Sequence, residues 1–460
     1  MSESAQNFLK KSKLKAFDKE HRKTIKFNIG KYNMAFHRGL EQYADIETAR
    51  LRAANIKHKA INDLDKYLIE FEQNFTNNGG KVIWANDTKE ATGEILKILT
   101  ERGVKKVVKS KSMTTEEIEL NQFLEKNGID PLETDLGEYI VQLGGEKPYH
   151  IVTPAMHKSK EDVAKLFHEK FDWDENLSPE EMTQKVREKL RTKFYEAEAG
   201  ITGANFLIAD TGSIALTENE GNGVMSMALP KLHIIIVGIE KVIPSINDLN
   251  LLWPLLSTHG TGQHVTVYNS IISGPKQDTE KDGPIETFVI LLNNNRTEIL
   301  KQEEQSQALS CIRCGACLNA CPVYKNIGGH TYETTYTGPI GSVISPWLLG
   351  MKEYKHLSFA STLCGACTEV CPVKIPLHDL LLRNRKDTVE KKYTTASERI
   401  MVKGWEKVML KPKLMDIVGG KTKNMVASLF FKKAWGPSRE LPKFADKSFH
   451  KKWLEQHPEK

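Results

Sequence analysis

The chain has 460 residues, of which 40% are hydrophobic and 27% charged, with a formal net charge of +6. This length predicts two or three domains with buried cores rather than one. The longest apolar run, 232–239, is far shorter than the about 20 residues of a membrane-crossing helix, and the polar N-terminus lacks the apolar core of a secretory signal. These features exclude a membrane-spanning or secreted class and predict a cytoplasmic protein.

Charge is unevenly distributed along the chain. Residues 1–60 carry 14 lysines and arginines against 6 acidic residues, and residues 381–460 carry 20 against 9, so the middle is acidic. In the simpler interpretation, basic terminal helices lie against an acidic body. In a sharper one, the C-terminal segment binds an acidic partner or an anionic inner-membrane surface with a quinone-side acceptor, helped by Trp405, Phe430, Phe431, Trp435 and Trp453. No recognition motif accompanies the charge, so we expect no nucleic-acid binding.

Residues 1–75 are predicted to form a basic helical segment, because apolar and charged residues alternate at helical spacing until the sequence TNNGG. An α/β pattern follows, with strands expected at 81–86 and 105–110 and helices at 87–104 and 114–128. In the last of these helices, Thr114 and Glu117 fit a capping box, and Gly128 fits the left-handed turn that ends a helix.

The α/β pattern continues to about residue 295. A strand is expected in YHIVTP (149–154) and a helix at 178–198. Four β-rich runs separated by Gly, Pro and Asn turns are predicted to form a mixed sheet covered by helices: 206–218, 231–239, 264–272 and 286–294. A polar helical connector at 296–310 then leads directly to the first cysteine.

All seven cysteines lie between 311 and 371, in the runs CIRCGACLNACP and STLCGACTEVCP. Thiols concentrated in one segment of a cytoplasmic protein are more often metal ligands than disulfide partners. Paired CxxC motifs also bind zinc. However, a zinc site does not require the CxxCxxCxxxCP run twice in nearly identical form, so we expect iron-sulfur clusters in an α-helical, two-cluster ferredoxin module.

In a bacterial-type ferredoxin run, the fourth cysteine ligates the other cluster. Three cysteines at intervals of three wrap a loop around one cluster, with Gly315 allowing close approach, and Pro322 tolerates the first helical turn after the fourth cysteine. This crossing assigns one 4Fe-4S cluster to Cys311, Cys314, Cys317 and Cys371. It leaves the second cluster with three thiolates, from Cys321, Cys364 and Cys367.

Ser361 stands where the eighth cysteine would be. Its oxygen could bind the fourth iron of the second cluster. Water, or His330 or His356 in the intervening loop, could take that place instead, or the iron could be absent, leaving a 3Fe-4S centre. Both histidines also fit ordinary loop positions. We favour a 4Fe-4S cluster with a non-cysteine fourth site.

The chain contains no G-x-G-x-x-G sequence and no P-loop. A protein with two neighbouring clusters and no visible flavin or nicotinamide fingerprint is expected to pass electrons on rather than generate them. The predicted domains are therefore 1–75 (basic helices), 76–295 (α/β), 296–385 (two-cluster module) and 386–460 (basic helical extension).

The sequence resembles the lactate utilization protein B family over nearly its whole length. The resemblance rests on CIRCGACLNACPVY and LCGACTEVCPVKIPL, which follow TGANFLIADTGSIALTENEGNG. It implies an electron-transport role in oxidising L-lactate to pyruvate, beside a second cysteine-rich subunit and a smaller subunit with the same α/β domain. It further implies an α/β fold related to sugar-phosphate isomerases and CoA transferases. The family also has three cysteines in its second run, so Ser361 is no departure from it.

Alternative functions remain at this point. The chain could serve a glycolate-type 2-hydroxy-acid oxidase or act as a redox-sensing scaffold. It could also be an enzyme whose α/β domain converts a phosphorylated or CoA-linked substrate, with structural clusters. Two groups of residues could serve binding or catalysis by that domain: an anion cradle of Lys109, Ser110, Lys111 and Ser112, and the polar residues Asp210, Ser213, Glu218 and Glu220. A solvated lysine edge and a hairpin turn explain the same residues, so we expect a non-catalytic electron-transfer subunit.

Overall fold

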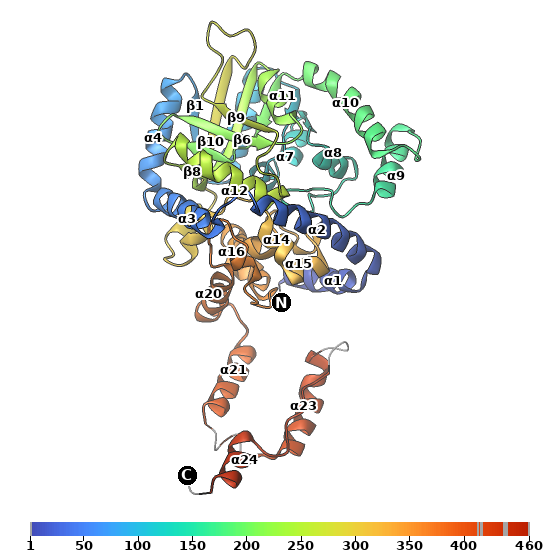
Figure 1. The fold of residues 1–460 in the computed structure, drawn as a ribbon, viewed down its shortest axis with the longest axis vertical. Coiled ribbons are helices and arrows are strands. Elements are labelled where there is room, and N and C mark those ends of the chain that lie inside the picture. Colours follow the sequence, from blue (N-terminus) through green and yellow to red (C-terminus); the bar gives the residue numbers. More distant parts are fainter. Residues whose placement is uncertain (1, 412–413, 415–416, 436–439, 459–460) are drawn as a thin grey trace. The chain divides into compact units, whose positions relative to one another are not determined.

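The computed structural model describes residues 2–411, 414, 417–435 and 440–458 (Figure 1). The chain divides into two compact units, Met1–Lys386 and Asp387–Lys460. The segments predicted at 1–75, 76–295 and 296–385 therefore lie together in the first unit. Within the described ranges, none of the helices combines the length and the apolar character needed to cross a bilayer.

A parallel sheet of six strands lies at the centre of the first unit. Its strands, in spatial order, are β1 (Lys81–Ala85), β10 (Glu286–Leu292), β7 (Leu232–Gly238), β4 (Ala199–Thr202), β2 (Lys106–Lys109) and β3 (Asp130–Glu133). Every residue of β7 is buried, because both faces of this strand are covered. Ile234 and Ile236 pack with α5 (Thr88–Glu101) and α7 (Leu120–Lys126). Ile235 and Val237 pack on the other face, with α4 (Leu64–Asn77).

A second sheet of four strands packs beside α4. Its order is β8 (Val242–Ile243), β5 (Phe206–Ile208), β6 (Ser213–Glu218) and β9 (Tyr268–Ile272), and all its pairs except β5–β8 are antiparallel. The predicted strands are thus present, but the prediction of one mixed sheet is wrong. Strand β7 pairs with β4 and β10, whereas the β5–β6 hairpin pairs with β8 and β9 in the second sheet.

Two local predictions in the α/β region also need correction. The stretch 114–128 forms two helices, α6 (Met113–Glu117) and α7, separated by Glu119 in a left-handed conformation. Ser112, not Thr114, caps α6 by accepting a hydrogen bond from the Thr115 N–H, and Glu117 binds Arg296 instead of the cap. The stretch 149–154 forms bends rather than a strand. Gly128 does adopt the expected positive φ, of 74°.

Further helices flank the sheets. They are α8 (Leu136–Leu143), α9 (Lys160–Phe171), α10 (Pro179–Glu196), α11 (Asn222–Ala228) and α12 (Leu249–Thr261). The predicted helix at 178–198 is confirmed as α10, which begins at a capping box formed by Ser178 and Glu181. Helices α8, α9 and α10 share a separate apolar cluster with Val108 of β2.

The N-terminal helices extend over both the sheets and the cysteine-containing segment (Figure 1). They are α1 (Glu3–Phe17), α2 (Lys19–Leu40), α3 (Ile46–Asn62) and α4. On α3, Arg50 donates from Nε to the carbonyl of Cys371 at 3.0 Å and from Nη2 to the carbonyl of Glu369. Glu47 adds an ion pair to Lys374 at 2.7 Å. Helix α3 therefore holds the second cysteine run in place.

The cysteine-containing segment consists of short helices joined by tight loops. These are α13 (Arg296–Leu300), a 3-10 turn at Gln305–Ser310, α14 (Ala316–Ala320), α15 (Pro322–Ile327), α16 (Gly338–Leu349), α17 (Met351–Tyr354), α18 (His356–Phe359), α19 (Ala366–Glu369) and α20 (Leu377–Glu390). Five of the seven cysteines belong to the apolar cluster that also includes residues of α1, α2, α3 and α12, Cys311 packs against it, and Cys364 is exposed. A ferredoxin-like helical module is therefore built into the core of the first unit.

The second unit contains helices α21 (Ala396–Met409), α23 (Gly420–Trp435) and α24 (Phe449–Gln456). Large apolar side chains on α21 are exposed, among them Ile400 at 72% and Trp405 at 62%. Residues 387–460 carry 17 lysines and arginines against 9 acidic residues. This unit therefore combines exposed apolar groups with a strongly positive charge.

Candidate metal centres and the adjoining cavity

Four thiols lie around one small cavity, which we call centre 1. They belong to Cys311, Cys314, Cys317 and Cys371, and the rest of the wall is mainly apolar, with Ile151, Ile312, Ile340, Val373, Ile375 and Leu377. None of the cysteines forms a disulfide. The structure thus brings the last cysteine of the second run to the first three cysteines of the first run.

The thiols of centre 1 are close enough to repel one another when ionised. Burial raises the pKa of Cys317 well above its ordinary value, and the charges of the other three thiolates raise it further. A metal centre is the usual way to hold several thiolates in an apolar site, because its positive charge compensates theirs. The donor set and its apolar wall therefore fit an iron-sulfur cluster.

The loop of the first run is shaped by residues between the cysteines. The Arg313 N–H donates to Cys311 Sγ at 3.4 Å, with Arg313 at a φ of 62°. Gly315 follows at 79°, and a Cβ there would lie 3.0 Å from a ring carbon of His150, so glycine is required. Helix α14 then carries Cys317, and Cys321 caps α15, which begins at Pro322 as predicted.

The other three thiols, from Cys321, Cys364 and Cys367, form a second group, which we call centre 2. Burial raises the pKa of Cys367 to about 12, and the charges of Cys321 and Cys364 contribute to the rise. Cys364 is exposed, whereas the other two are buried. Centre 2 therefore reaches the protein surface, and centre 1 is enclosed more deeply.

The two cysteine runs fold alike around these centres. In the second run, Leu363 has a φ of 54° and Gly365 one of 84°, matching Arg313 and Gly315. The Leu363 N–H donates to Ser361 Oγ at 3.1 Å, in the same way as the Arg313 N–H donates to Cys311 Sγ. Ser361 therefore occupies the conformation of the missing cysteine.

The two histidines considered as alternatives to Ser361 have other contacts. His330 Nε2 bonds to the carbonyl of Lys147 at 2.7 Å, and its ring packs against His157. His356 Nδ1 lies 3.3 Å from the carbonyl of Glu353, and its ring packs against Phe8. Its buried Nε2 has no hydrogen-bond partner among the described residues.

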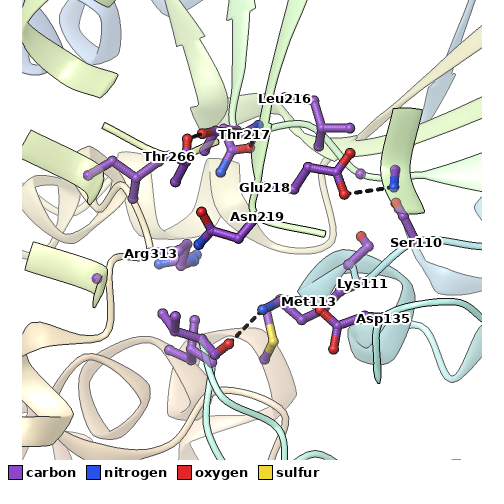
Figure 2. A pocket seen from close by; sticks show the side chains of 18 of the residues that line it. Ser110, Lys111, Met113, Asp135, Leu216, Thr217, Glu218, Asn219, Thr266 and Arg313 are labelled. Atoms are coloured by element: carbon purple, nitrogen blue, oxygen red, sulfur yellow. Dashed lines mark hydrogen bonds between the residues drawn. The ribbon is translucent and has the colours of Figure 1, made fainter. Parts of the chain in front are cut away.

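A larger cavity of about 370 Å³ lies between the α/β sheets and centre 1 (Figure 2). Arg313 and Cys314 line both this cavity and centre 1. Lys241, which comes soon after the end of β7, contributes a buried ammonium group. The cavity wall also carries Glu218 and Glu220, from the end of β6 and the loop that follows. The cavity therefore joins a polar α/β site to the first group of thiols.

The two carboxylates on that wall are anchored by main-chain groups. Glu218 accepts from the N–H groups of Gly223 and Val224, at 2.7 and 2.8 Å. Glu220 accepts from the Leu136 N–H at 3.0 Å. Burial raises the pKa of Glu220 to about 7, and the charge of Asp135 adds to the rise. This wall is therefore well suited to accept hydrogen bonds from a bound molecule.

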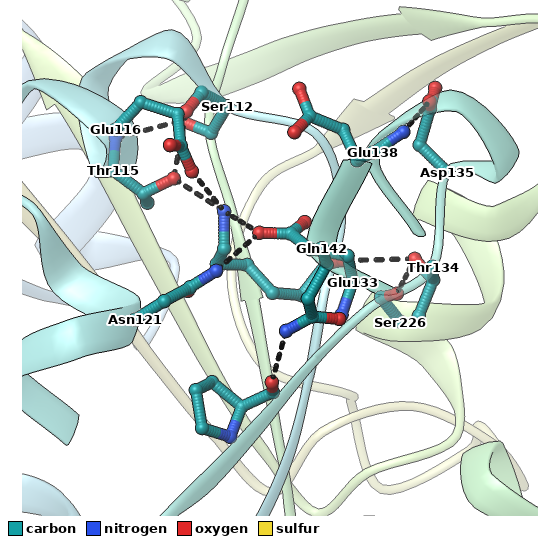
Figure 3. Close-up of polar contacts among 12 residues, drawn as sticks. Ser112, Thr115, Glu116, Asn121, Glu133, Thr134, Asp135, Glu138, Gln142 and Ser226 are labelled. Atoms are coloured by element: carbon teal, nitrogen blue, oxygen red, sulfur yellow. Dashed lines mark hydrogen bonds and ion pairs between the residues drawn. The ribbon is translucent and has the colours of Figure 1, made fainter. Parts of the chain in front are cut away.

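The anion cradle predicted at 109–112 needs correction. Lys109 is fully buried and pairs with Glu133 at 2.6 Å and Glu116 at 3.4 Å, so its charge is neutralised away from the cavity (Figure 3). Lys111 lines the cavity but donates to the Val152 carbonyl at 2.7 Å. Ser110 and Ser112 also line it.

Of the four predicted polar residues after β5, only two reach the cavity. Glu218 and Glu220 line it. Asp210 instead accepts from the Ile246 N–H, and Ser213 bonds Ser273 at 2.8 Å. Both pairings lie outside the cavity lining.

Sequence reasoning missed Lys241 and Arg313. Lys241 follows an apolar parallel strand, at the carboxyl edge of the sheet where α/β proteins usually bind ligands. Arg313 was visible only as a residue between two cysteines. The signal that could have identified Lys241 is the charged pair Glu240–Lys241, which comes directly after the apolar run LHIIIVGI.

A buried arginine joins these parts. Arg296 donates to Glu117 Oε2 at 2.8 Å and to Glu240 Oε2 at 2.6 Å. Tyr336 donates to the same Glu117 oxygen at 2.7 Å, and Arg313 donates to Glu240 at 3.2 Å. The α/β domain, the connector and the cysteine loop thus share one buried network of charges.

Comparison with known proteins places these features in a family. Residues 68–292 match the LUD domain, and residues 307–375 match a 4Fe-4S dicluster domain. Lactate utilization protein B of Bacillus subtilis is 46% identical over 367 residues, covering 79% of this chain and 76% of that protein. The chain belongs to the lactate utilization protein B family.

Other relatives of the family cover more of the chain. Lactate utilization protein B of Macrococcus caseolyticus is 42% identical and covers 90% of both chains. The uncharacterized electron transport protein YkgF of Escherichia coli is 41% identical, covering 89% of this chain and 88% of that one. A solved DUF162 family protein from Deinococcus radiodurans aligns with 50% of this chain and 98% of its own, at 15% identity and a TM-score of 0.30. The predicted family, the predicted α/β fold and the predicted 4Fe-4S domain are confirmed by the family matches and by the sheets of this structure.

Proposed function

We propose that this protein is the electron-transfer subunit of a complex that oxidises L-lactate to pyruvate, with one cluster in centre 1 and one in centre 2. The observation that carries the proposal is the exchange of cysteines between the runs, which puts Cys371 with the first group and Cys321 with the second. Its partners in the proposal are a cysteine-rich subunit and a smaller subunit with the same α/β domain.

The positions of the two centres support a route for electrons. Bound iron-sulfur clusters would supply one-electron transfer. Cys317 and Cys321 lie on and directly after the same short helix, so the two centres are neighbours. Centre 1 adjoins the large cavity, and centre 2 includes the exposed Cys364. The chain therefore connects an internal cavity to the surface where a partner could dock.

Reduction by substrate tests this function. We expect L-lactate to reduce the anaerobically purified protein only when both partner subunits are present, because a carrier of single electrons needs a partner that takes the electron pair from the substrate. The measurement is electron paramagnetic resonance (EPR), with iron and sulfide analysis. Zinc without sulfide, or lactate turnover by the isolated chain, would contradict the proposal. Reduction by glycolate but not by lactate would show that glycolate, and not lactate, is the substrate of the complex.

Two alanine variants test the exchange of cysteines. Cys321→Ala should lose centre 2 and roughly half of the bound iron, because only two thiolates would remain there. Cys371→Ala should make centre 1 labile, with three thiolates, while centre 2 keeps its EPR signal. Cys311→Ala is the matched control, since it should damage the same centre as Cys371→Ala. If Cys321→Ala damages that centre instead, each run binds its own cluster.

We propose further that Ser361 Oγ is the fourth ligand of the cluster in centre 2. Its support is the conformation that it shares with Cys311 and the loop that fixes it. Arg385 donates to the Ser361 carbonyl at 2.9 Å and to the Ser358 carbonyl at 2.9 Å. The side chain of Ser361 is therefore held on a loop of the same shape as the one that presents Cys311.

Substitution of Ser361 tests this ligand. Ser361→Cys should keep the 4Fe-4S cluster and change its midpoint potential, because ligand type sets the potential. Ser361→Ala should lose one iron and show a 3Fe-4S signal in the oxidised state. Ser397→Ala, in the second unit, is the control. An EPR spectrum of Ser361→Ala that matches the unaltered protein would contradict ligation by the serine.

We also propose that the second unit binds an anionic membrane surface, near a quinone-side acceptor. Two features support this interaction: the exposed apolar residues of α21, and the 17 basic residues that residues 387–460 carry against 9 acidic ones. Lys403→Glu with Lys407→Glu should weaken binding to phosphatidylglycerol vesicles, since each lysine near such a surface contributes about 1 kcal/mol. Sedimentation measures it, with Lys165→Glu on α9 as the control. Equal sedimentation of all three proteins would oppose the proposal.

A further inference from the structure

Lys241 is a buried cation with no counter-charge in contact. Its side chain is 7% exposed and lines the large cavity. Among the described residues, none forms a hydrogen bond with its ammonium group or an ion pair within 4.0 Å. Burial lowers the pKa of Lys241 to about 8 and the charge of Arg313 lowers it further, while the charges of Glu240 and Cys311 offset this only in part. An unpaired cation in such a place is costly unless something in the cavity compensates it.

Arg313 is only partly satisfied as well. Its guanidinium lies over the Tyr336 ring at 4.5 Å, and Nη2 donates to Glu240 at 3.2 Å. Its buried Nη1 has no hydrogen-bond partner among the described residues. Because Arg313 and Lys241 line the same cavity and repel each other, two positive charges border one space.

The cluster of centre 1 does not account for both donors. Arg313 lines the wall of centre 1 as well as the larger cavity, and the thiolate of Cys311 attracts both cations. Lys241, however, lines the larger cavity and not centre 1. Its ammonium is therefore available to a molecule bound in the larger cavity.

We propose that the large cavity binds a small organic anion, whose carboxylate or phosphate group accepts a hydrogen bond from Lys241 Nζ and is attracted by the charge of Arg313. The wall with Glu218 and Glu220 would accept hydrogen bonds from hydroxyl groups at the other end of the molecule. A volume of about 370 Å³ is within the range of small-molecule sites. This binding does not depend on the proposed function.

The site also couples the anion to centre 1, and this part rests on a cluster being bound there. Arg313 and Cys314 border both spaces, so a charge in the cavity acts on the cluster through buried groups. Reduction adds one negative charge to the cluster, so the anion binds the oxidised form more tightly. By reciprocity, the anion makes the midpoint potential more negative, by about 59 mV for each tenfold preference.

The test uses the full chain, purified without oxygen, and three probes. L-lactate and inorganic phosphate carry the two anionic groups, and L-lactamide is the neutral counterpart of lactate. Calorimetry measures binding, and redox titration followed by EPR measures the midpoint potential of centre 1. We expect lactate, phosphate or both to bind and to shift the potential negatively, and lactamide to do neither. The anion that binds more tightly identifies the group that the site recognises.

Variants of Lys241 show whether this residue makes the site. Lys241→Gln should weaken anion binding at least tenfold and abolish the shift in potential, while iron content and the EPR line shape stay unchanged. Lys241→Arg should restore binding. Lys231→Gln, at the opposite end of β7 and exposed, is the matched control. If Lys241→Gln loses its cluster, the binding and potential measurements on the unaltered protein decide whether the proposal holds.

Three results would overturn the proposal. They are the absence of binding by both anions to the unaltered protein, an equal potential shift with lactamide, or unchanged anion binding in Lys241→Gln. Each is distinct from failure of the proposed function, which is tested by reduction of the clusters in the presence of partner subunits.

Discussion

The position of the cysteine loop relative to the sheets depends on one buried guanidinium. Arg296 starts the connector and lies between Glu117, from α6, and Glu240, which follows β7. Tyr336 and Arg313 reach the same two carboxylates from the cysteine segment. Losing one member of such a buried network leaves an uncompensated charge and costs about 3–5 kcal/mol. Matching charges therefore fix the α/β domain and the thiol loops as one body.

This constraint explains why the large cavity meets centre 1. Parallel strands end at a common edge, and loops after those strands commonly form ligand sites in α/β proteins. Here the residues after β7 are held against Arg313, so the ligand edge of the sheet faces the thiols directly. In a looser arrangement, the sheet and the thiols would each form a site of their own. The buried charges instead make them parts of a single site.

Local patterns predicted the parts of the molecule that local forces determine. Strand β7 was evident as a continuous apolar run, and the cysteine spacing indicated loops that wrap a metal centre. The capping box at Thr114 and Glu117 failed because the helix begins earlier, with Ser112 as its cap, and Glu117 pairs with a distant residue, Arg296. Likewise, Lys109 appeared to be a free cation, but Glu133 is 24 residues away in sequence and only 2.6 Å away in space. Such pairings follow from strand order, which hydrophobic periodicity does not encode.

The contact between α3 and the second cysteine run has a consequence for the order of folding. Three thiols of centre 1 come from the compact loop 311–317, which local turns can shape early. The fourth, Cys371, is held by Arg50, from the other end of the polypeptide. Contacts between residues so far apart in sequence form late, because closing a long loop costs entropy before the contact stabilises it. A nascent chain therefore brings together only three of the four thiols of centre 1 until its first helices have docked. Completion of centre 1 marks the assembly of the whole first unit.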